Sequence, residues 1–356
     1  MLKVKQYLYS LVFRLQDVLA GLAHRNRFFA ALFYILVDHS FLREQMAVLS
    51  GRVKHLNETR NFKTNRYLLV RNVHRLEKGL LMRPRREIFA KDYIEETVDT
   101  FEALWNGAES RSDQQLKWSR DVLHEYFRAI SVEDDIVDLH RRRFQVITNG
   151  TALTNGNANS PLSVPYESGS IDRCDISYDD LYKLSRQRRS TRWFLNKPVS
   201  RDLIDKAMLV ANQSPSACNR QPYEFRVFDE PEKVLEISQF PMGTVGFAEN
   251  IPVIVVVVGN LDAYFNERDR HLIYIDSALA AMSFMLALET LGLASCPINW
   301  PDIEVRERMM EKALGLKAYQ RPIMCIGLGY PDPEGKIAFS EKRQLGQIRN
   351  FNNYKK

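Results

Sequence analysis

The segment Arg188-Arg189-Ser190-Thr191-Arg192 holds the residues of this sequence best suited to binding a charged ligand. Three arginines and a serine fall within five positions. Guanidinium groups bind a phosphate through paired hydrogen bonds, and a hydroxyl group adds a further one. The composition alone leaves two interpretations open, a phosphate site and a solvated basic turn.

Three further segments in the second half of the chain carry polar groups of the same general use. The loop Ser214-Pro-Ser-Ala-Cys-Asn-Arg-Gln-Pro222 has short polar side chains that suit the edge of a planar polar ring. The segment Ser295-Cys-Pro-Ile-Asn-Trp300 follows a long apolar stretch, and Ser340-Glu-Lys-Arg343 adds two cations. These segments favour a bound ligand over a basic turn.

Several other kinds of site lack the residues they need. The sequence contains no Gly-x-x-x-x-Gly-Lys-Ser/Thr loop, and Gly327-Leu-Gly329 is followed by Asp332 where a dinucleotide loop requires glycine. His271 is the one histidine after residue 148, which argues against a metal site or a Ser-His-Asp triad there. The four cysteines show no C-x-x-C spacing, so we predict reduced thiols and no metal.

Alternating helices and strands position these segments. The patterns predict helices over 202–213, 272–293 and 303–314, and strands over 223–228, 251–258 and 322–329. The run Ile251–Val258 has no polar alternation, which indicates a strand buried on both faces. The stretch 272–293 is long enough to span a membrane, but it carries Asp276 and Glu289, so we predict a buried helix.

The first part of the chain has a different character. Apolar spacing predicts helices over residues 1–30, 41–56, 64–80, 90–106 and 114–146. Residues 148–173 are rich in Asn, Gly, Ser, Thr and Pro, which is typical of a linker. We therefore predict a mainly helical region over residues 1–147, a linker over 148–173 and a second domain over 174–356.

The charge distribution is as uneven as the composition. Residues 1–91 hold 18 Lys/Arg and 6 Asp/Glu, whereas residues 92–150 hold 7 and 13 and residues 151–356 hold 25 of each. The basic excess at residues 1–91 suggests peripheral contact with an anionic membrane or an acidic partner, and a solvated helical face is the alternative. We expect no nucleic acid partner. Because Arg14 and Asp17 interrupt the apolar stretch that begins at Leu8, we expect a cytoplasmic protein without a signal peptide.

In their order and spacing, the four polar segments resemble the FMN-dependent nitroreductase family over roughly residues 180–350. The R-R-S-x-R-x-F and P-S-x-x-N-x-Q-P patterns carry the resemblance. It implies an α+β fold, a mixed central sheet flanked by helices, that follows the helical N-terminal region. It also implies a homodimer with two FMN sites at the subunit interface, NAD(P)H as the reductant and a small-molecule substrate.

The resemblance also assigns site residues. Arg188, Arg189, Ser190 and Arg192 would hold the FMN phosphate and ribityl chain, and Lys342 and Arg343 would complete the phosphate pocket. Pro215, Ser216, Ala217 and Asn219 of the other subunit would line the flavin. Pro297, Ile298 and Asn299 would lie beside the isoalloxazine ring, with a backbone N–H near flavin N5. No catalytic side chain is assigned, because the flavin carries the hydride chemistry.

Two features depart from or extend this pattern. Asn299-Trp300 replaces a Glu-Gly pair that many family members have after Pro-Ile, which predicts a different pocket over the flavin. The segments Phe41–Gly51 and His74–Leu80 resemble the extra N-terminal region of nitroreductase-like proteins encoded near bacterial surface-polysaccharide genes. For His74, Glu77 and Lys78, we favour a buried ion pair with a capping glycine over a functional cluster.

The leading interpretation is an FMN-dependent oxidoreductase that uses NAD(P)H and passes electrons to an unidentified substrate, with a link to surface-polysaccharide biosynthesis. A second interpretation keeps the flavin but predicts a dehydrogenase or other specialised chemistry on an aromatic or heterocyclic substrate. A third is a non-enzymatic flavin-binding scaffold that acts through its N-terminal helices.

Overall fold

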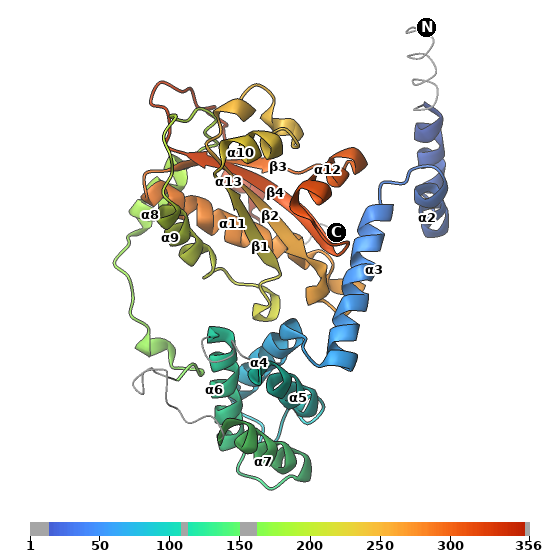
Figure 1. Cartoon of the computed structure of the whole chain (residues 1–356), viewed down its shortest axis with the longest axis vertical. Helices are drawn as coiled ribbons and strands as arrows, with labels where there is room; N and C mark the ends of the chain where they lie inside the picture. Colours follow the sequence, from blue (N-terminus) through green and yellow to red (C-terminus); the bar gives the residue numbers. More distant parts are fainter. Residues whose placement is uncertain (1–13, 108–112, 150–161, 353–356) are drawn as a thin grey trace.

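The computed structural model describes residues 14–107, 113–149 and 162–352, and these form a sheet domain, a helical body and a helical arm (Figure 1). The sheet has four strands in the order β1-β2-β4-β3. They are β1 (Tyr223–Phe228), β2 (Val253–Asn260), β4 (Gln320–Gly329) and β3 (Ala294–Asn299). All three pairings are antiparallel, and the one parallel contact of the described chain is an isolated bridge from Ser190 to Ser295.

Helices cover both faces of this sheet because β2 is apolar at every position from Val253 to Val258. The side chains of Ile254, Val256 and Val258 pack with α10 (Pro231–Ser238) and α12 (Glu304–Leu314). Val253, Val255 and Val257 pack with α9 (Arg201–Ala211) and α11 (Leu272–Thr290) on the opposite face. The α+β class, the flanking helices and the doubly buried strand are confirmed, whereas the sheet expected to be mixed has only antiparallel strand pairings in the described chain.

Three elements of this domain escape the sequence patterns. They are α8 (Tyr178–Gln187), α10 and β3. The first two are short, at 10 and 8 residues, so each offers only about two or three turns over which a helical period could be recognised. Strand β3 contains Pro297 and has six residues, features that read as a loop in the sequence.

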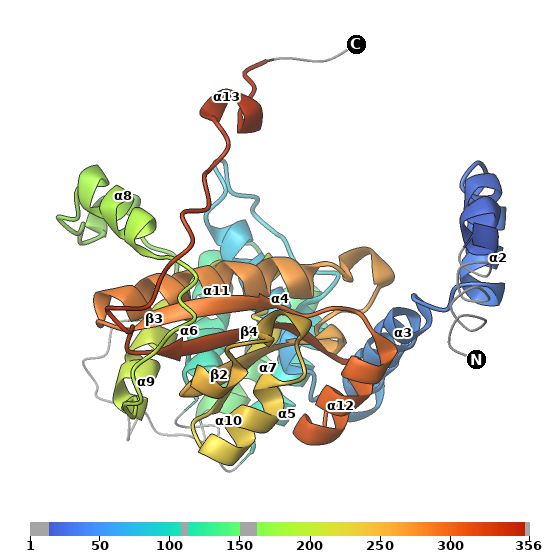
Figure 2. The same cartoon turned by 90° about the horizontal axis from the view of Figure 1, so that it is seen from above.

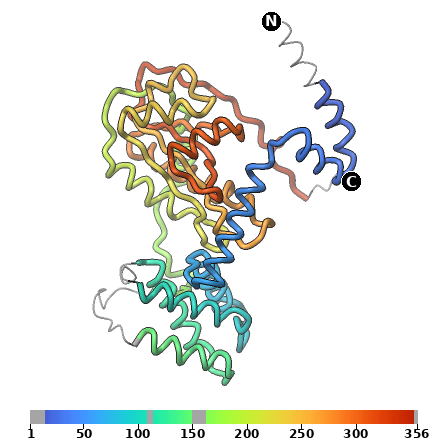
Figure 3. The backbone as a smooth tube through the Cα atoms, turned by 45° about the vertical axis from the view of Figure 1, so that its right-hand side comes forward, coloured from blue at the N-terminus to red at the C-terminus, as the bar shows by residue number. Residues whose placement is uncertain are grey.

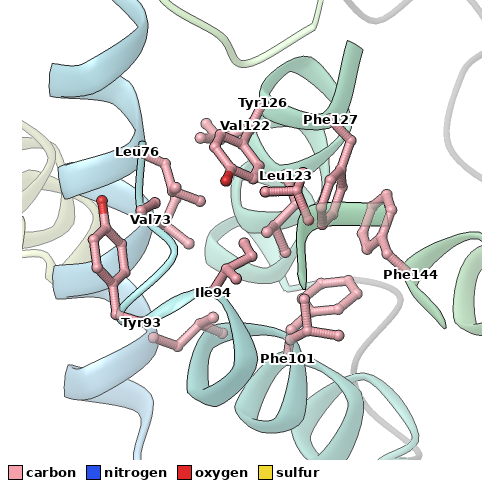
Figure 4. Close-up of a cluster of buried hydrophobic side chains, with 14 of the residues drawn as sticks. Val73, Leu76, Tyr93, Ile94, Phe101, Val122, Leu123, Tyr126, Phe127 and Phe144 are labelled. Carbon is pink, nitrogen blue, oxygen red and sulfur yellow. The ribbon is translucent and has the colours of Figure 1, made fainter. Parts of the chain in front are cut away.

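The helical body consists of α4 (Arg66–Leu80), α5 (Ile94–Trp105), α6 (Gln114–Ala129) and α7 (Asp135–Asn149). Its own core contains side chains from all four helices, among them Val73, Leu76, Ile94, Phe101, Leu123, Tyr126 and Phe144 (Figure 4). The single helix expected over 114–146 is wrong. Helix α6 ends at Ala129. The Asp134 carboxylate then accepts hydrogen bonds from the backbone N–H groups of Ile136 and Val137, and this cap begins α7.

Helix α3 (Leu42–Asn57) joins the helical body to the sheet domain and runs along that domain (Figure 3). A Cβ atom on Gly51 would stand 2.6 Å from the Leu261 carbonyl, so only glycine permits this close approach. The His55 ring lies 2.8 Å from the Asp262 carbonyl oxygen, and Lys54 pairs with the Asp262 carboxylate. Two further pairs join α3 to the domain, Arg52 with Glu267 and Arg43 with both Glu304 and Glu311.

The start of the described chain is an exposed helical arm. Residues 14–23 are helical, a turn follows, and α2 (Arg27–Leu36) begins where the Asn26 side chain accepts from the Phe28 N–H. One helix over residues 1–30 is therefore wrong at His24–Asn26, and residues 1–13 lie outside the described chain. Helix α2 contains no buried residue and projects away from the domain (Figure 2).

The apolar span Glu267–Thr290 is long enough to cross a membrane by length and composition. Half of it is buried in the protein, and its α11 portion packs on α9 and the sheet. The expectation of a buried helix is confirmed for the face that packs on α9 and the sheet, whereas Ile275, Leu279 and Met282 are exposed. The division at residues 147 and 173 stays a prediction, and residues 150–161 of the expected linker lie outside the described chain.

Candidate functional site

The basic segment Arg188–Arg192 lies at the start of β3. Helix α8 ends at Gln187, whose side chain donates to Glu289 near the end of α11 (3.2 Å). The Thr191 backbone N–H then donates to the Ser295 carbonyl oxygen at 3.0 Å. The fold therefore places two of the predicted site segments side by side, the arginines and the strand that carries Pro297.

The arginines of this segment form no ion pair in the described chain, although the Arg188 charge favours the ionised form of the partly buried Glu289. One Arg189 N–H donates to the Arg188 carbonyl oxygen at 2.9 Å, and one Arg192 N–H lies 3.5 Å from the Ser190 carbonyl oxygen. No described carboxylate stands within ion-pair distance of Arg188, Arg189 or Arg192. Three guanidinium groups that form no ion pair fit the phosphate of FMN.

Strand β3 presents its residues alternately to the core and to the outside. Pro297 is half-buried and Asn299 exposed, whereas the Ile298 side chain packs in the core, so Ile298 offers a ligand only its backbone. The expectation that Trp300 changes the pocket over the flavin is wrong. Trp300 belongs to the core, and its indole N–H donates to Glu307 at 2.8 Å, because strand alternation turns position 300 inward.

The loop Ser214–Pro222 has an unusual backbone. Cys218, Asn219 and Gln221 have φ values of 54°, 55° and 50°, a region that side chains other than glycine seldom adopt. Each such residue costs about 1–3 kcal/mol and persists only where the surroundings enforce it. Strain of this kind concentrates at ligand sites, which supports the assignment of this loop to a binding function.

Polar contacts to α11 hold the loop in this shape. The Ser214 hydroxyl donates to the Ser283 hydroxyl at 2.8 Å, and the Ala217 N–H donates to the Asp276 carboxylate at 3.0 Å. The Gln221 N–H donates to the Ser216 hydroxyl at 3.0 Å. Burial raises the pKa of Asp276, while the Ala217 N–H and the Arg220 charge favour its ionised form. In the sequence, Asp276 is recognisable only as a charge in an apolar helix. Its proximity to the loop cannot be deduced from the residue spacing.

Within one chain, the arginine segment and the loop Ser214–Pro222 contact opposite ends of α11. Gln187 contacts Glu289, and Ala217 contacts Asp276, thirteen residues earlier. At 1.5 Å per residue these contacts are about 20 Å apart. Lys342 and Arg343 are exposed on a C-terminal segment that leaves the domain, and no described contact joins them to Arg188–Arg192 (Figure 2). Within one chain, the predicted site is therefore not assembled.

The helical body lies against the loop Ser214–Pro222. Helix α4 packs beside residues Ala217–Asn219. On its other turns, His74 lies 3.4 Å from Glu77, which accepts from the Trp118 indole N–H at 2.9 Å. The sequence predicts Gly79 as a capping glycine, and this prediction is wrong. Gly79 lies within α4, where an added Cβ atom would stand 2.2 Å from the Phe89 ring. The His74–Glu77 pair is thus part of the packing of α4 on α6.

The two buried thiols are held in their protonated form. Burial raises the pKa of Cys296, and it raises that of the fully buried Cys325 to about 12, so both favour the protonated form. Across the described ranges, no group of three or more His, Cys, Asp or Glu side chains is placed to hold a metal ion.

The second half of the chain is similar to known proteins. Residues 185–245 and 231–330 match the model of the nitroreductase family. An iodotyrosine deiodinase from Thermotoga neapolitana is 28% identical over 187 residues, covering 45% of this chain and 94% of that protein. An NADH dehydrogenase from Thermus thermophilus is 27% identical over 180 residues, covering 42% and 85%.

A solved structure is similar over the same share of the chain. The FMN-dependent nitroreductase of Clostridium difficile aligns with 48% of this chain and 98% of its own, at 24% identity and a TM-score of 0.41. The family match begins at residue 185, so the helical body and the arm lie outside it. The family match and the relatives support an oxidoreductase.

Proposed function

We propose that this protein is an FMN-dependent oxidoreductase that takes electrons from NAD(P)H and passes them to a small-molecule substrate. The observation that carries the proposal is the set of three arginines beside β3 that form no ion pair in the described chain, within the part of the chain that matches the nitroreductase family model. Arg188, Arg189, Ser190 and Arg192 bind the FMN phosphate, whose charge of about two negative units they offset.

The chain's remaining contribution is orientation. FMN, when bound, supplies the hydride chemistry, so no acid–base side chain is required at the site. The backbone of Pro297–Asn299 donates and accepts hydrogen bonds along the ring edge, and Ile298 fixes that backbone because its side chain is anchored in the core. The strained loop Ser214–Asn219 contributes its short polar groups from a fixed backbone.

The active form is a homodimer in this proposal. The arginine segment and the loop are about 20 Å apart in one chain, so a second chain has to supply one of them. Ile275, Leu279 and Met282, spaced along one face of α11, are apolar and at least 40% exposed. Such a row is suited to burial against a second copy. Sedimentation velocity tests this point, and a monomer that retains FMN would contradict it.

A visible spectrum of the purified protein tests the proposal itself. An FMN spectrum that bleaches when NAD(P)H is added without oxygen is the expected result. A protein that neither contains FMN nor binds added FMN would refute the proposal and favour the scaffold interpretation. Retained FMN that NAD(P)H does not bleach would refute the reductant and favour a dehydrogenase or other specialised flavin chemistry.

We further propose that the basic N-terminal arm contacts an anionic membrane surface. Phe28, Phe29 and Leu36 of α2 are more than half exposed, next to Arg25 and Arg27. An apolar face beside arginines is suited to the lipid–water interface. Flotation with anionic liposomes, with and without residues 1–30, tests this proposal, and equal flotation contradicts it. A link to surface-polysaccharide biosynthesis stays a prediction.

A further inference from the structure

A second group of arginines lies where the helical body meets the loop Ser214–Pro222. Arg71 and Arg75 are one turn apart on α4, on the side roughly opposite the core residues Val73 and Leu76. Arg220 immediately follows Asn219 in the loop. We refer to Arg71, Arg75 and Arg220 as the junction arginines.

Aromatic rings hold each of these guanidinium groups. The Arg71 guanidinium carbon lies 4.9 Å from the centre of the Phe265 ring, and that of Arg220 lies 5.1 Å from the neighbouring Tyr264 ring. The Arg75 guanidinium lies 3.5 Å from the Tyr93 ring. Contact with a ring face orders the guanidinium plane but uses none of the N–H donors at its edge.

These donors have few acidic partners. Arg220 is 4% exposed, its Nε atom has no hydrogen-bond partner, and neither it nor Arg71 forms an ion pair within the described residues. Arg75 is 3.7 Å from Asp92, which is largely exposed. Burial and the charges of Arg75 and Arg220 lower the pKa of Arg71. Like charges in a partly buried place are costly unless an anion joins them.

Space for a ligand is present next to Arg220. Arg220 lines a cavity of about 450 Å³ between α3, α4 and the sheet domain, together with Lys54, Arg66, Glu58 and Asp262, whereas Arg71 and Arg75 lie outside that lining. Lys54 pairs with Asp262, and Arg66 pairs with Asp113. Arg220 is therefore the cation of the lining that forms no ion pair in the described chain, although its charge favours the ionised form of Asp276.

We propose that the junction arginines form an anion-binding site that selects a substrate carrying a phosphate or carboxylate group. This proposal rests on the proposed function, in which the loop Ser214–Asn219 lines the flavin. The anion-binding site adjoins Cys218 and Asn219 of that loop. Two of the three arginines come from the helical body, which gives that body a role in choosing the substrate. The FMN phosphate is a less suitable occupant, because Arg188–Arg192 already offers three guanidinium groups for it.

Calorimetry on the full-length FMN-loaded protein tests the site without requiring turnover. The probes are benzyl phosphate, phenylacetate and benzyl alcohol, which share a ring and differ in charge. We expect one of the two anions to bind at least tenfold more tightly than the alcohol. Arg71→Gln with Arg75→Gln should remove that preference, and Arg71→Lys should keep part of it because the charge remains.

The control is Arg128→Gln on α6, which removes an exposed arginine paired with Glu125 and should change nothing. Equal binding of all three probes, or an anion preference that survives the double substitution, would overturn the proposal. Loss of FMN from the double variant, with anion binding unchanged, would overturn it in favour of a second FMN phosphate contact. If the wild-type protein lacks FMN, the same titration on the flavin-free chain still reports on the anion site, so the two proposals fail separately.

Discussion

Two groups of arginines in this protein are free of strong acidic partners, and they arise in different ways. Arg188, Arg189 and Arg192 lie within five positions of one segment beside β3. Arg71, Arg75 and Arg220 are brought together only when α4 packs on the loop Ser214–Pro222. Both groups offer guanidinium donors to an anion, but the first is visible in the sequence and the second is not.

Other arginines of the described chain have their charges balanced within it. Arg43 contacts two carboxylates and Arg143 contacts Asp99 and Glu102, so their charges are balanced within the chain. Arginines of that kind join structural elements. An arginine that is partly buried, ordered by its neighbours and without a carboxylate has a charge that the fold itself does not use. We therefore assign FMN phosphate to the first group and a substrate anion to the second.

The largest expected effect comes from breaking the first group. Arg188→Ala with Arg192→Ala should lower FMN affinity at least about hundredfold, because each charged hydrogen-bond donor contributes about 1.5–3 kcal/mol. Flavin absorbance per chain after gel filtration measures the loss. Arg201→Ala, which removes an exposed arginine paired with Asp229 in the same domain, is the control. Full FMN retention by the double variant would contradict the assignment.

The second group depends on the docking of α3 and can be perturbed without touching an arginine. Gly51→Ala forces a Cβ atom to 2.6 Å from the Leu261 backbone, three residues before Tyr264. Overpacking should lower the free energy of unfolding by about 1–3 kcal/mol, and benzyl phosphate binding should weaken while FMN is retained. Urea unfolding and calorimetry measure both. Gly21→Ala is the control, because no atom lies within 4 Å of its added Cβ.

Asp276 affects both proposed sites, because it holds the strained loop that borders each of them in the proposed dimer. Asp276→Ala removes the acceptor of the Ala217 N–H and should lower the free energy of unfolding by about 1–3 kcal/mol. Asp276→Asn keeps an acceptor and should cost less. Because burial raises the pKa of Asp276, its charged form is penalised in the folded state.

That penalty is absent below the unfolded-state pKa of about 3.9 and grows as pH rises toward the folded-state value. The stability of Asp276→Asn relative to wild type should therefore increase as pH rises through this window. Urea unfolding between acidic and neutral pH measures the trend, and a relative stability that falls with pH would be inconsistent with a buried carboxyl.

The smallest effect concerns a paired arginine. Arg43→Ala removes the contacts to Glu304 and Glu311 and should cost at most about 1 kcal/mol, because these side chains are partly exposed. Arg43 and Arg308 lower the pKa of Glu304 to about 2, so the contribution is present above pH 4.5 and is lost as pH falls toward 2. Acid unfolding of Arg43→Ala and of Arg308→Ala measures it, and a cost unchanged at low pH would show that packing dominates.

The sequence predicts those parts of the fold that rest on local patterns. The run Val253–Val258 could only be a doubly buried strand, and the R-R-S-x-R segment needed no tertiary information. Strand β3 was missed because Pro297 interrupts it, and the inward orientation of Trp300 follows from that strand. Arg71 and Arg220 are separated by 149 positions in the sequence, so no spacing rule could join them.

A crystal structure of the FMN-loaded protein with benzyl phosphate most directly tests the different roles assigned to the two arginine groups. Our account predicts the FMN phosphate bound by Arg188, Arg189 and Arg192, and the benzyl phosphate bound by Arg71, Arg75 and Arg220. Electron density for the FMN phosphate at the junction arginines, with Arg188–Arg192 free, would contradict it.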